Sequence, residues 1–260
     1  ILIAPLMTCS ARLPVYAVII AAFIPERTVG PGVGLQGLVL FCLYIAGIAG
    51  AMFAAYILRR TVTKGPAPGF LMEMPRYQMP ILRDVLLGLW QRAIIFLRRA
   101  GTIIAATTAV LWLLVSYPKA PADYAQPAID YSIAGRIAGA LEPVFAPVGF
   151  NRDMALALIP AMAAREVAVS ALATVYAVDA EDEAVQEQSL VQRLQGRWSL
   201  PTALAFLAWF VFAPQCVSTI AVVRRETNSW KWTGFMLAYL FGLAYIAAGA
   251  TYWSALALGL

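Results

Sequence analysis

Residues 159–170 read IPAMAAREVAVS and place Arg165 and Glu166 side by side in a stretch otherwise apolar enough to cross a membrane. An ionisable side chain at the bilayer centre costs about 2.5–3.5 kcal/mol on insertion scales, so it normally faces a protein interior or a water-filled path. Pro160 interrupts the same stretch, because proline removes a helical hydrogen bond. The sequence therefore predicts a broken membrane segment in which the Glu166 carboxylate is functional.

The composition of the whole chain points to the same environment. Of 260 residues, 62% are hydrophobic and 13% are charged, and the mean hydropathy is +0.75. A soluble domain of this length could not bury so much apolar surface. Basic residues cluster between positions 59 and 99, as is typical of juxtamembrane segments on the cytoplasmic side and not of a nucleic-acid-binding surface. The predicted fold class is an all-α integral membrane protein.

Several function classes are excluded by residue type. The chain has no histidine, and its three cysteines form no CxxC pair. These absences exclude a zinc ribbon, a haem attachment site and a histidine-based catalytic triad. No GxxxxGK[ST] or GxGxxG motif offers a nucleotide site. Whatever chemistry the protein performs must therefore use carboxylate, sulfur, hydroxyl and backbone groups.

Apolar runs predict the membrane helices. The runs without interruption cover residues 35–58, 101–117 and 232–256. Three more runs are long enough to span but contain prolines and polar residues, and they cover residues 2–24, 153–178 and 200–223. Lipid tolerates such breaks only where the freed backbone is buried in protein or lines a cavity. The sequence thus predicts a polytopic helical bundle with broken or re-entrant helices.

The connecting segments have distinct compositions. Residues 81–99 interleave arginine with leucine, isoleucine and tryptophan, which predicts an amphipathic helix along the inner interface. Residues 118–152 are expected to form a polar loop with a short helix, and residues 179–199 an acidic loop. The positive-inside rule favours a re-entrant segment at 153–178, with the acidic loop outside and Arg224 inside. A full crossing by that segment is the alternative.

A polar stripe surrounds Glu166. Met162, Glu166, Ser170 and Thr174 recur every four residues, so on a helix they share one face. A thioether, a carboxylate and two hydroxyls in a row could pass a cation along the helix. Alternatively, Glu166 pairs with a neighbouring basic group and the two hydroxyls bond back to helix carbonyls.

Sulfur donors lie in two of the predicted breaks. The string PLMTCSARLP at 5–14 places Met7 and Cys9 between two prolines, and APQCVST at 213–219 contains Cys216. Soft sulfur beside hard oxygen suits a borderline ion such as ferrous iron better than magnesium or calcium. Each cysteine could equally be a small buried hydrophobe. On the residues alone, the two interpretations are evenly balanced.

Cys42 has a different setting. It begins a row with a small residue at every fourth position, namely Cys42, Ala46, Gly50 and Ala54. Such a row lets another helix approach closely. The pattern therefore predicts packing at Cys42 and not metal ligation.

Four strings resemble, in the right order, the membrane part of the ferrous iron transport protein B (FeoB) family. They are PLMTCSARLPVY at 5–16, FLMEMPRYQMP at 70–80, AAREVAVSALATVY at 163–176 and APQCVSTIAVVRRETNSWKW at 213–232. Arg165 departs modestly from the family, where lysine is common, and it keeps the charge but presents a planar fork. The resemblance implies a bundle with broken or re-entrant gate helices and an interfacial amphipathic helix.

The resemblance also implies a division of the chain. Residues 1–62 would be a first gate region truncated at its start, and residues 63–100 a cytoplasmic loop with the interfacial helix. Residues 101–152 would hold a transmembrane helix and an extracytoplasmic loop. Residues 153–260 would form the second gate region with the final transmembrane helices. Because the chain begins at Ile1 inside an apolar run, we expect it to be part of a longer polypeptide.

By this resemblance, the chain would be the permease part of an Fe(II) importer in the bacterial inner membrane, and therefore a transporter and not an enzyme. Cys9, Cys216 and Glu166 would lie closest to the ion, with Met7, Met162, Ser170 and Thr174 assisting. Fe(II) would be the transported substrate, and the chain itself would hold no cofactor, since GTP and magnesium belong to a cytoplasmic G domain outside it. The implied partners are the lipid bilayer, that G domain in cis or as a separate chain, small accessory Feo proteins and a second copy of the chain in a homo-oligomer, but no nucleic acid.

Two other classes of function remain open. A membrane protein of related gate architecture could carry a nucleoside or another organic solute. A subunit that binds partners without transporting anything is the third class. Iron accumulation distinguishes an iron importer from a carrier of organic solutes. Ion flux in liposomes distinguishes an iron importer from a subunit that transports nothing.

Overall fold

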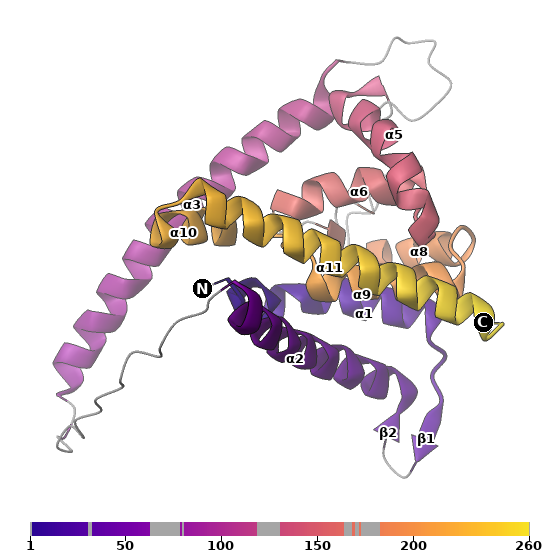
Figure 1. Cartoon of the computed structure of the whole chain (residues 1–260), viewed down its shortest axis with the longest axis horizontal. Coiled ribbons are helices and arrows are strands. Elements are labelled where there is room, and N and C mark those ends of the chain that lie inside the picture. The colour runs from indigo at the N-terminus through magenta and orange to yellow at the C-terminus, as the bar shows by residue number, and fades with distance from the viewer. Residues whose placement is uncertain are drawn as a thin grey trace.

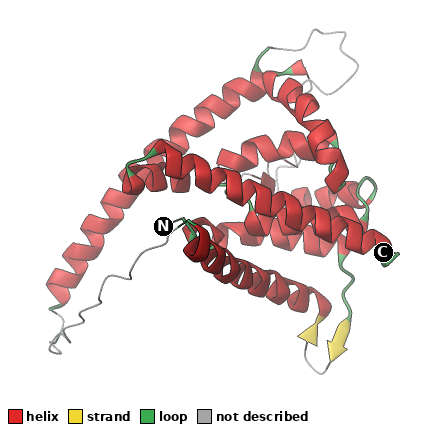
Figure 2. Cartoon of the chain, in the orientation of Figure 1, coloured by secondary structure: helices red, strands yellow, loops and turns green. Residues whose placement is uncertain are grey.

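The computed structural model describes residues 2–30, 33–62, 79, 81–118, 131–163, 168–169, 172 and 183–259. Helices dominate these residues (Figures 1 and 2), which confirms the all-α class. The elements are η1 (Ala4–Leu6), η2 (Ser10–Arg12), α1 (Leu13–Phe23), β1 (Thr28–Gly30), β2 (Val33–Gly34), α2 (Leu35–Thr61), α3 (Leu82–Ser116), α5 (Ile133–Phe145), η3 (Ala146–Val148), α6 (Arg152–Ala163), α8 (Glu183–Gln195), α9 (Leu200–Phe212), α10 (Val217–Thr227) and α11 (Trp230–Ala257). The strands β1 and β2 form only a small antiparallel hairpin before α2.

Two of the predicted spans are confirmed. The helix α2 has 27 residues and α11 has 28, and both are long and apolar enough to cross a membrane. At 1.5 Å per residue each exceeds the hydrocarbon thickness of about 30 Å. Arg59 and Arg60 lie in the last turn of α2, where cations favour the negative end of a helix. Large apolar side chains such as Phe41 and Met52 are exposed on α2, as expected for a surface that faces lipid.

The helix α3 differs from the prediction. The sequence predicted an interfacial helix at 81–99 and a separate span at 101–117, but one helix of 35 residues runs from Leu82 to Ser116. Gly101 disfavours a helix by only about 1 kcal/mol, and no proline lies within this segment to break it. The predicted boundary between two helices is therefore wrong. Figure 1 shows α3 as a long helix along one side of the molecule.

The interruption predicted at Pro160 is also wrong, because α6 continues through this residue to Ala163. Proline near the end of a helix removes one hydrogen bond and kinks the helix without stopping it. Among the described residues a sharp bend comes earlier: residues 133–148 and α6 are bent by 109°, as in a broken span or a re-entrant loop. Gly149 lies at this bend with φ +82°, and a Cβ there would be 2.2 Å from Cε2 of Tyr252. Only glycine fits both constraints.

The segment predicted as an acidic loop contains the helix α8. Leu190, Leu194 and Trp198 follow one another at four-residue spacing, and all three are buried in the main core. The side-chain amide of Gln195 donates a 2.6 Å hydrogen bond to the Ala22 carbonyl at the end of α1. This segment is therefore packed against the bundle.

The breaks predicted in the apolar runs at 2–24 and 200–223 are confirmed. The run at 2–24 divides into η1, η2 and α1, and the run at 200–223 divides into α9 and α10. The helix α9 is central to the main core, which it shares with residues of α1, α6, α8 and α11. Rings of Phe206 and Trp209 on α9 pack edge-on against Phe150. The break between α9 and α10 is thus flanked on one side by a helix that is packed in the main core.

Candidate functional site

The first break is a loop closed by a buried arginine. Arg12 is fully buried, and its Nη2 donates a 3.1 Å hydrogen bond to the Pro5 carbonyl. Its backbone N–H donates to the Cys9 carbonyl at 3.2 Å. The bond to Pro5 connects the two ends of the segment, and the bond to Cys9 closes the short turn η2; Met7 and Cys9 lie in the extended backbone between η1 and η2. Met7 is 63% exposed, and Cys9 is exposed as well.

The second break results from Pro214. The last turn of α9 closes where the Ala213 N–H donates to the Trp209 carbonyl, and Pro214 has no N–H with which to continue the ladder. The N–H of Gln215 donates to the Ala213 carbonyl at 3.0 Å, which forms a tight turn. Cys216 then adopts extended backbone as the N-cap residue of α10, and its side chain is half-buried.

Gln215 occupies the interior of this break. Its side chain is fully buried, and neither Oε1 nor Nε2 has a hydrogen-bond partner. Sequence reasoning missed this residue. The available signal was an amide placed directly after a proline in an apolar run, but its burial depends on the packing of distant elements.

The two breaks border one another. Leu6 from the first break belongs to the same hydrophobic cluster as Val223 of α10, with Phe212 and Ile220 packed against it. A Cβ on Gly47 of α2 would lie 3.2 Å from Thr8 Cγ2 and 3.6 Å from Val211 Cγ1. The first break, the middle of α2 and the end of α9 therefore meet.

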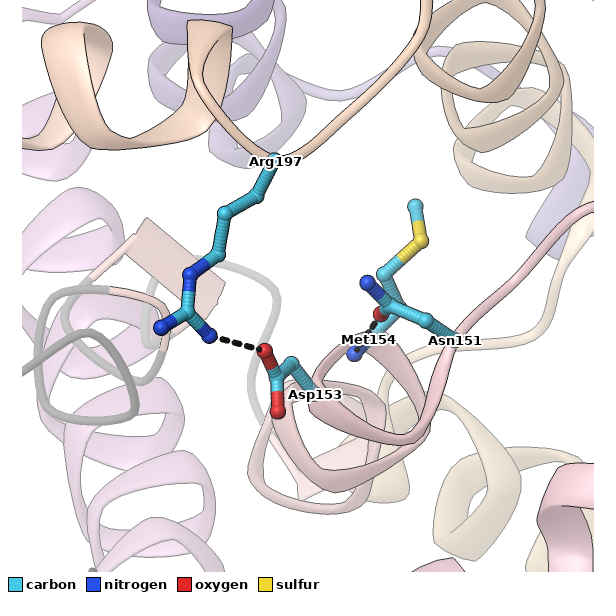
Figure 3. A network of polar contacts seen from close by, with 4 residues as sticks. All are labelled: Asn151, Asp153, Met154 and Arg197. Atoms are coloured by element: carbon cyan, nitrogen blue, oxygen red, sulfur yellow. Dashed lines mark hydrogen bonds and ion pairs between the residues drawn. The ribbon is translucent and has the colours of Figure 1, made fainter.

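The helix α6, which carries Met162 near its end, contacts α10. Its first turn is fixed by Asn151, whose Oδ1 accepts a 2.9 Å hydrogen bond from the Met154 N–H (Figure 3). Asp153 Oδ2 accepts a 3.1 Å bond from Nη1 of Arg197, in the turn between α8 and α9. One end of α6 is thus anchored, and Met162 lies half-buried near the other.

The structure places four of the predicted site residues on neighbouring elements, namely Met7, Cys9, Met162 and Cys216. Glu166, Ser170 and Thr174 lie outside the described residues, so the polar stripe stays a prediction. Nearly all of the string at 70–80 lies outside them as well. Within the described part of the chain, no three His, Cys, Asp or Glu side chains are grouped so that they could hold a metal ion.

The small-residue row on α2 has two different surroundings. Ala54 is buried and Gly50 lies against the ring of Phe212, as the packing prediction requires. Cys42 and Ala46 instead line an apolar cavity of about 330 Å³ between α2, α9 and α11. Cys42 itself is exposed, so the prediction of close packing is wrong at this residue.

Comparison with known families gives two matches. The model described as "Ferrous iron transport protein B C terminus" matches residues 40–92. The Gate model, described as "Nucleoside recognition", matches residues 97–230. No solved structure matches the chain.

Similar proteins cover nearly all of this chain. It is 36% identical over 259 residues to "Fe(2+) transporter FeoB" of Leptospira interrogans serogroup Icterohaemorrhagiae serovar copenhageni, with 94% of this chain and 37% of the relative aligned. It is 35% identical to the protein of the same name from Staphylococcus aureus strain COL, with 95% and 34% aligned. The "Fe(2+) transport protein A/Fe(2+) transporter FeoB fusion protein" of Porphyromonas gingivalis is 32% identical, with 96% and 33% aligned.

The alignments and the family models agree. The chain spans about a third of the length of these relatives. Within that third, the order of broken and continuous helices fits a membrane region. The chain therefore belongs to the ferrous iron transport protein B family, with a Gate region over residues 97–230.

Proposed function

We propose that this chain is the membrane permease part of a bacterial Fe(II) importer. The observation that carries the proposal is the meeting of two helix breaks, each with a cysteine, between helices long enough to cross a membrane. Broken helices at a repeat or bundle interface are where transporters commonly bind their substrates. The names of the similar proteins support Fe(II) as the substrate.

In the proposed mechanism, Fe(II) exchanges water for protein ligands at the breaks. The sulfur atoms of Cys9 and Cys216 bind it most directly, with Met7 and Met162 assisting. The predicted stripe of Glu166, Ser170 and Thr174 continues the path with oxygen ligands. Binding at each position must be weak, because an ion held by a complete shell of ligands would not leave.

Movement of one gate region against the other would alternate access to the two sides of the membrane. We propose that a cytoplasmic G domain, in cis or as a separate chain, supplies the energy by binding and hydrolysing GTP. The relatives are about three times as long as this chain, which leaves room for such a domain. The fusion relative that includes Fe(2+) transport protein A supports a small accessory protein as a further partner. The proposed location is the bacterial inner membrane, crossed several times.

A nucleoside or another organic solute is the second candidate substrate, because the Gate model is described as "Nucleoside recognition". Such a substrate would need hydrogen-bonding groups and an aromatic surface, and it would have no need of a cysteine in each of two breaks. The two candidates therefore predict different effects of removing sulfur.

The test is flux by the full-length protein in proteoliposomes that contain an Fe(II)-quenched dye. We expect Fe(II) entry, no uptake of labelled nucleosides, and reduced Fe(II) entry in the Glu166→Gln variant. Nucleoside uptake without Fe(II) entry would establish the second candidate instead. Absence of both fluxes, together with retained binding of partner proteins, would contradict transport altogether.

A further inference from the structure

The amide of Gln215 is the least satisfied polar group in the second break. The side chain is fully buried, and neither its oxygen nor its nitrogen has a hydrogen-bond partner. Buried amides in folded proteins almost always have a partner, since desolvation without one is unfavourable. A buried amide without a partner at the break between two helices therefore indicates a ligand that binds there transiently.

The backbone around Gln215 favours a cation as that ligand. Pro214 has no N–H to offer the carbonyl four residues earlier, at the end of α9. The C-terminal end of a helix carries a partial negative charge. In transporters with broken helices, unwound carbonyls and half-helix C-terminal ends coordinate the cations. In the sequence, Gln215 follows this end of α9 by three residues and directly precedes Cys216, the N-cap residue of α10.

We propose that Gln215 Oε1 is an oxygen ligand for Fe(II) and that it acts together with Cys216 Sγ in the break between α9 and α10. This inference rests on the proposed function, and it adds a residue that determines metal specificity. One hard oxygen beside one soft sulfur suits a borderline ion such as Fe(II). A pair of sulfurs at the same place would favour softer ions.

A purely structural role for Gln215 makes the opposite prediction for ion flux. If the amide were only a poorly satisfied core group, an apolar side chain of similar size would be neutral or stabilising, and ion flux would not change. The same holds if the amide binds only a water molecule that takes no part in transport. Stability and flux must therefore be measured on the same variants.

The variants are Gln215→Leu, which removes the oxygen, and Gln215→Met, which replaces it with sulfur at similar length. The control is Gln192→Leu on the exposed face of α8, outside the breaks. Each is made in the full-length protein, reconstituted in proteoliposomes, and assayed for Fe(II) and Cd(II) entry over a range of ion concentrations. Thermal unfolding is recorded in parallel.

For Gln215→Leu we expect the Fe(II) concentration at half-maximal flux to rise by about tenfold or more, with an unfolding temperature equal to or above that of the unaltered protein. For Gln215→Met we expect the preference for Fe(II) over Cd(II) to fall or invert. Wild-type Fe(II) flux in Gln215→Leu would overturn the inference. If Gln215→Leu does not fold, an unchanged Fe(II) to Cd(II) preference in Gln215→Met would overturn it.

The design separates this inference from the proposed function. If the unaltered protein and Gln192→Leu both transport Fe(II) while the Gln215 variants do so equally well, only the role of Gln215 is lost. If the unaltered protein transports no Fe(II), the proposed function fails, and the assignment of Gln215 fails with it.

Discussion

Gly50 of α2 lies directly against the ring of Phe212, the last residue of α9. A Cβ on Gly50 would come within 2.3 Å of Phe212 Cε1 and within 3.2 Å of its Cζ. The chain leaves its helical path one residue after Phe212, at Ala213. The close approach of these two residues therefore joins the long helix of the first gate region to the start of the second break.

Replacing Gly50 with alanine should destabilise the protein. Overpacking of this kind typically costs about 1–3 kcal/mol, and because the added Cβ would lie only 2.3 Å from a ring atom we expect a cost in the upper part of this range, above the gain of about 1 kcal/mol in helix propensity. The matched control is Gly37→Ala in the same helix, where a Cβ meets nothing within 4 Å and the propensity gain should remain. Thermal unfolding in detergent measures both variants.

The partner of Gly50 offers a rescue. Truncating Phe212 to leucine removes the ring atoms that a methyl at Gly50 would meet, so the double variant should lose less stability than the sum of the two single changes. Equal unfolding temperatures for Gly50→Ala and Gly37→Ala would show that the two helices do not approach as closely as described.

Gly149 should tolerate substitution still less well. Its φ of +82° disfavours any side chain, and a Cβ there would also meet Tyr252 at 2.2 Å. Gly259 has a similar φ of +73° but open space around it, so Gly259→Ala reports the backbone cost alone, about 1–2 kcal/mol. We expect Gly149→Ala to be more destabilising than Gly259→Ala, and comparable unfolding temperatures would argue against the contact with Tyr252.

The two anchors of α6 should differ in strength (Figure 3). Asn151→Ala removes the N-cap bond to the Met154 N–H, at a cost of about 1 kcal/mol. Arg197→Gln removes the ion pair with Asp153, in which the Arg197 side chain is 64% exposed, and such a pair contributes at most about 1 kcal/mol. Only the Arg197 effect should shrink as salt is added. A larger, salt-independent loss in Arg197→Gln would contradict this assignment.

The sequence was most informative where a local property decides the structure. The apolar runs that became α2 and α11 are long enough to span a membrane by themselves. Pro214 ends α9 because it lacks an N–H, and Pro5 falls in the short turn η1. These elements depend on residues within one or two turns of the helix, so their positions could be predicted.

The predictions failed where contacts between residues far apart in the sequence determine the structure. The bend before α6 is set by the fit of Gly149 against Tyr252, which lies far along the chain, and not by Pro160. The acidic residues of the segment at 179–199 concealed the four-residue spacing of Leu190 and Leu194, whose burial makes it a packed helix. The spacing was visible in the sequence, but the surface that buries it was not.

The candidate site shows the same division. Residue chemistry and proline positions made Cys9 and Cys216 candidate ligands, on even terms with a packing role, and the structure places both at helix breaks. Gln215 was not selected, because an amide becomes notable only when packing buries it without a partner. For a buried polar group, position in the fold carries information that residue type does not.

Passage of Fe(II) through the two breaks is tested most directly by Fe(II) uptake into proteoliposomes that contain full-length protein with Cys9→Ser, Cys216→Ser or Cys42→Ser. Cys9 and Cys216 lie at the two breaks, whereas Cys42 lies within the continuous helix α2, where it lines an apolar cavity. We predict that either break variant reduces the Fe(II) entry rate by about tenfold or more, since even the groups that support metal ligands change affinity or activity by about 10- to 100-fold, and that Cys42→Ser transports at the unaltered rate. Unchanged uptake in both Cys9→Ser and Cys216→Ser would contradict passage of the ion through the two breaks.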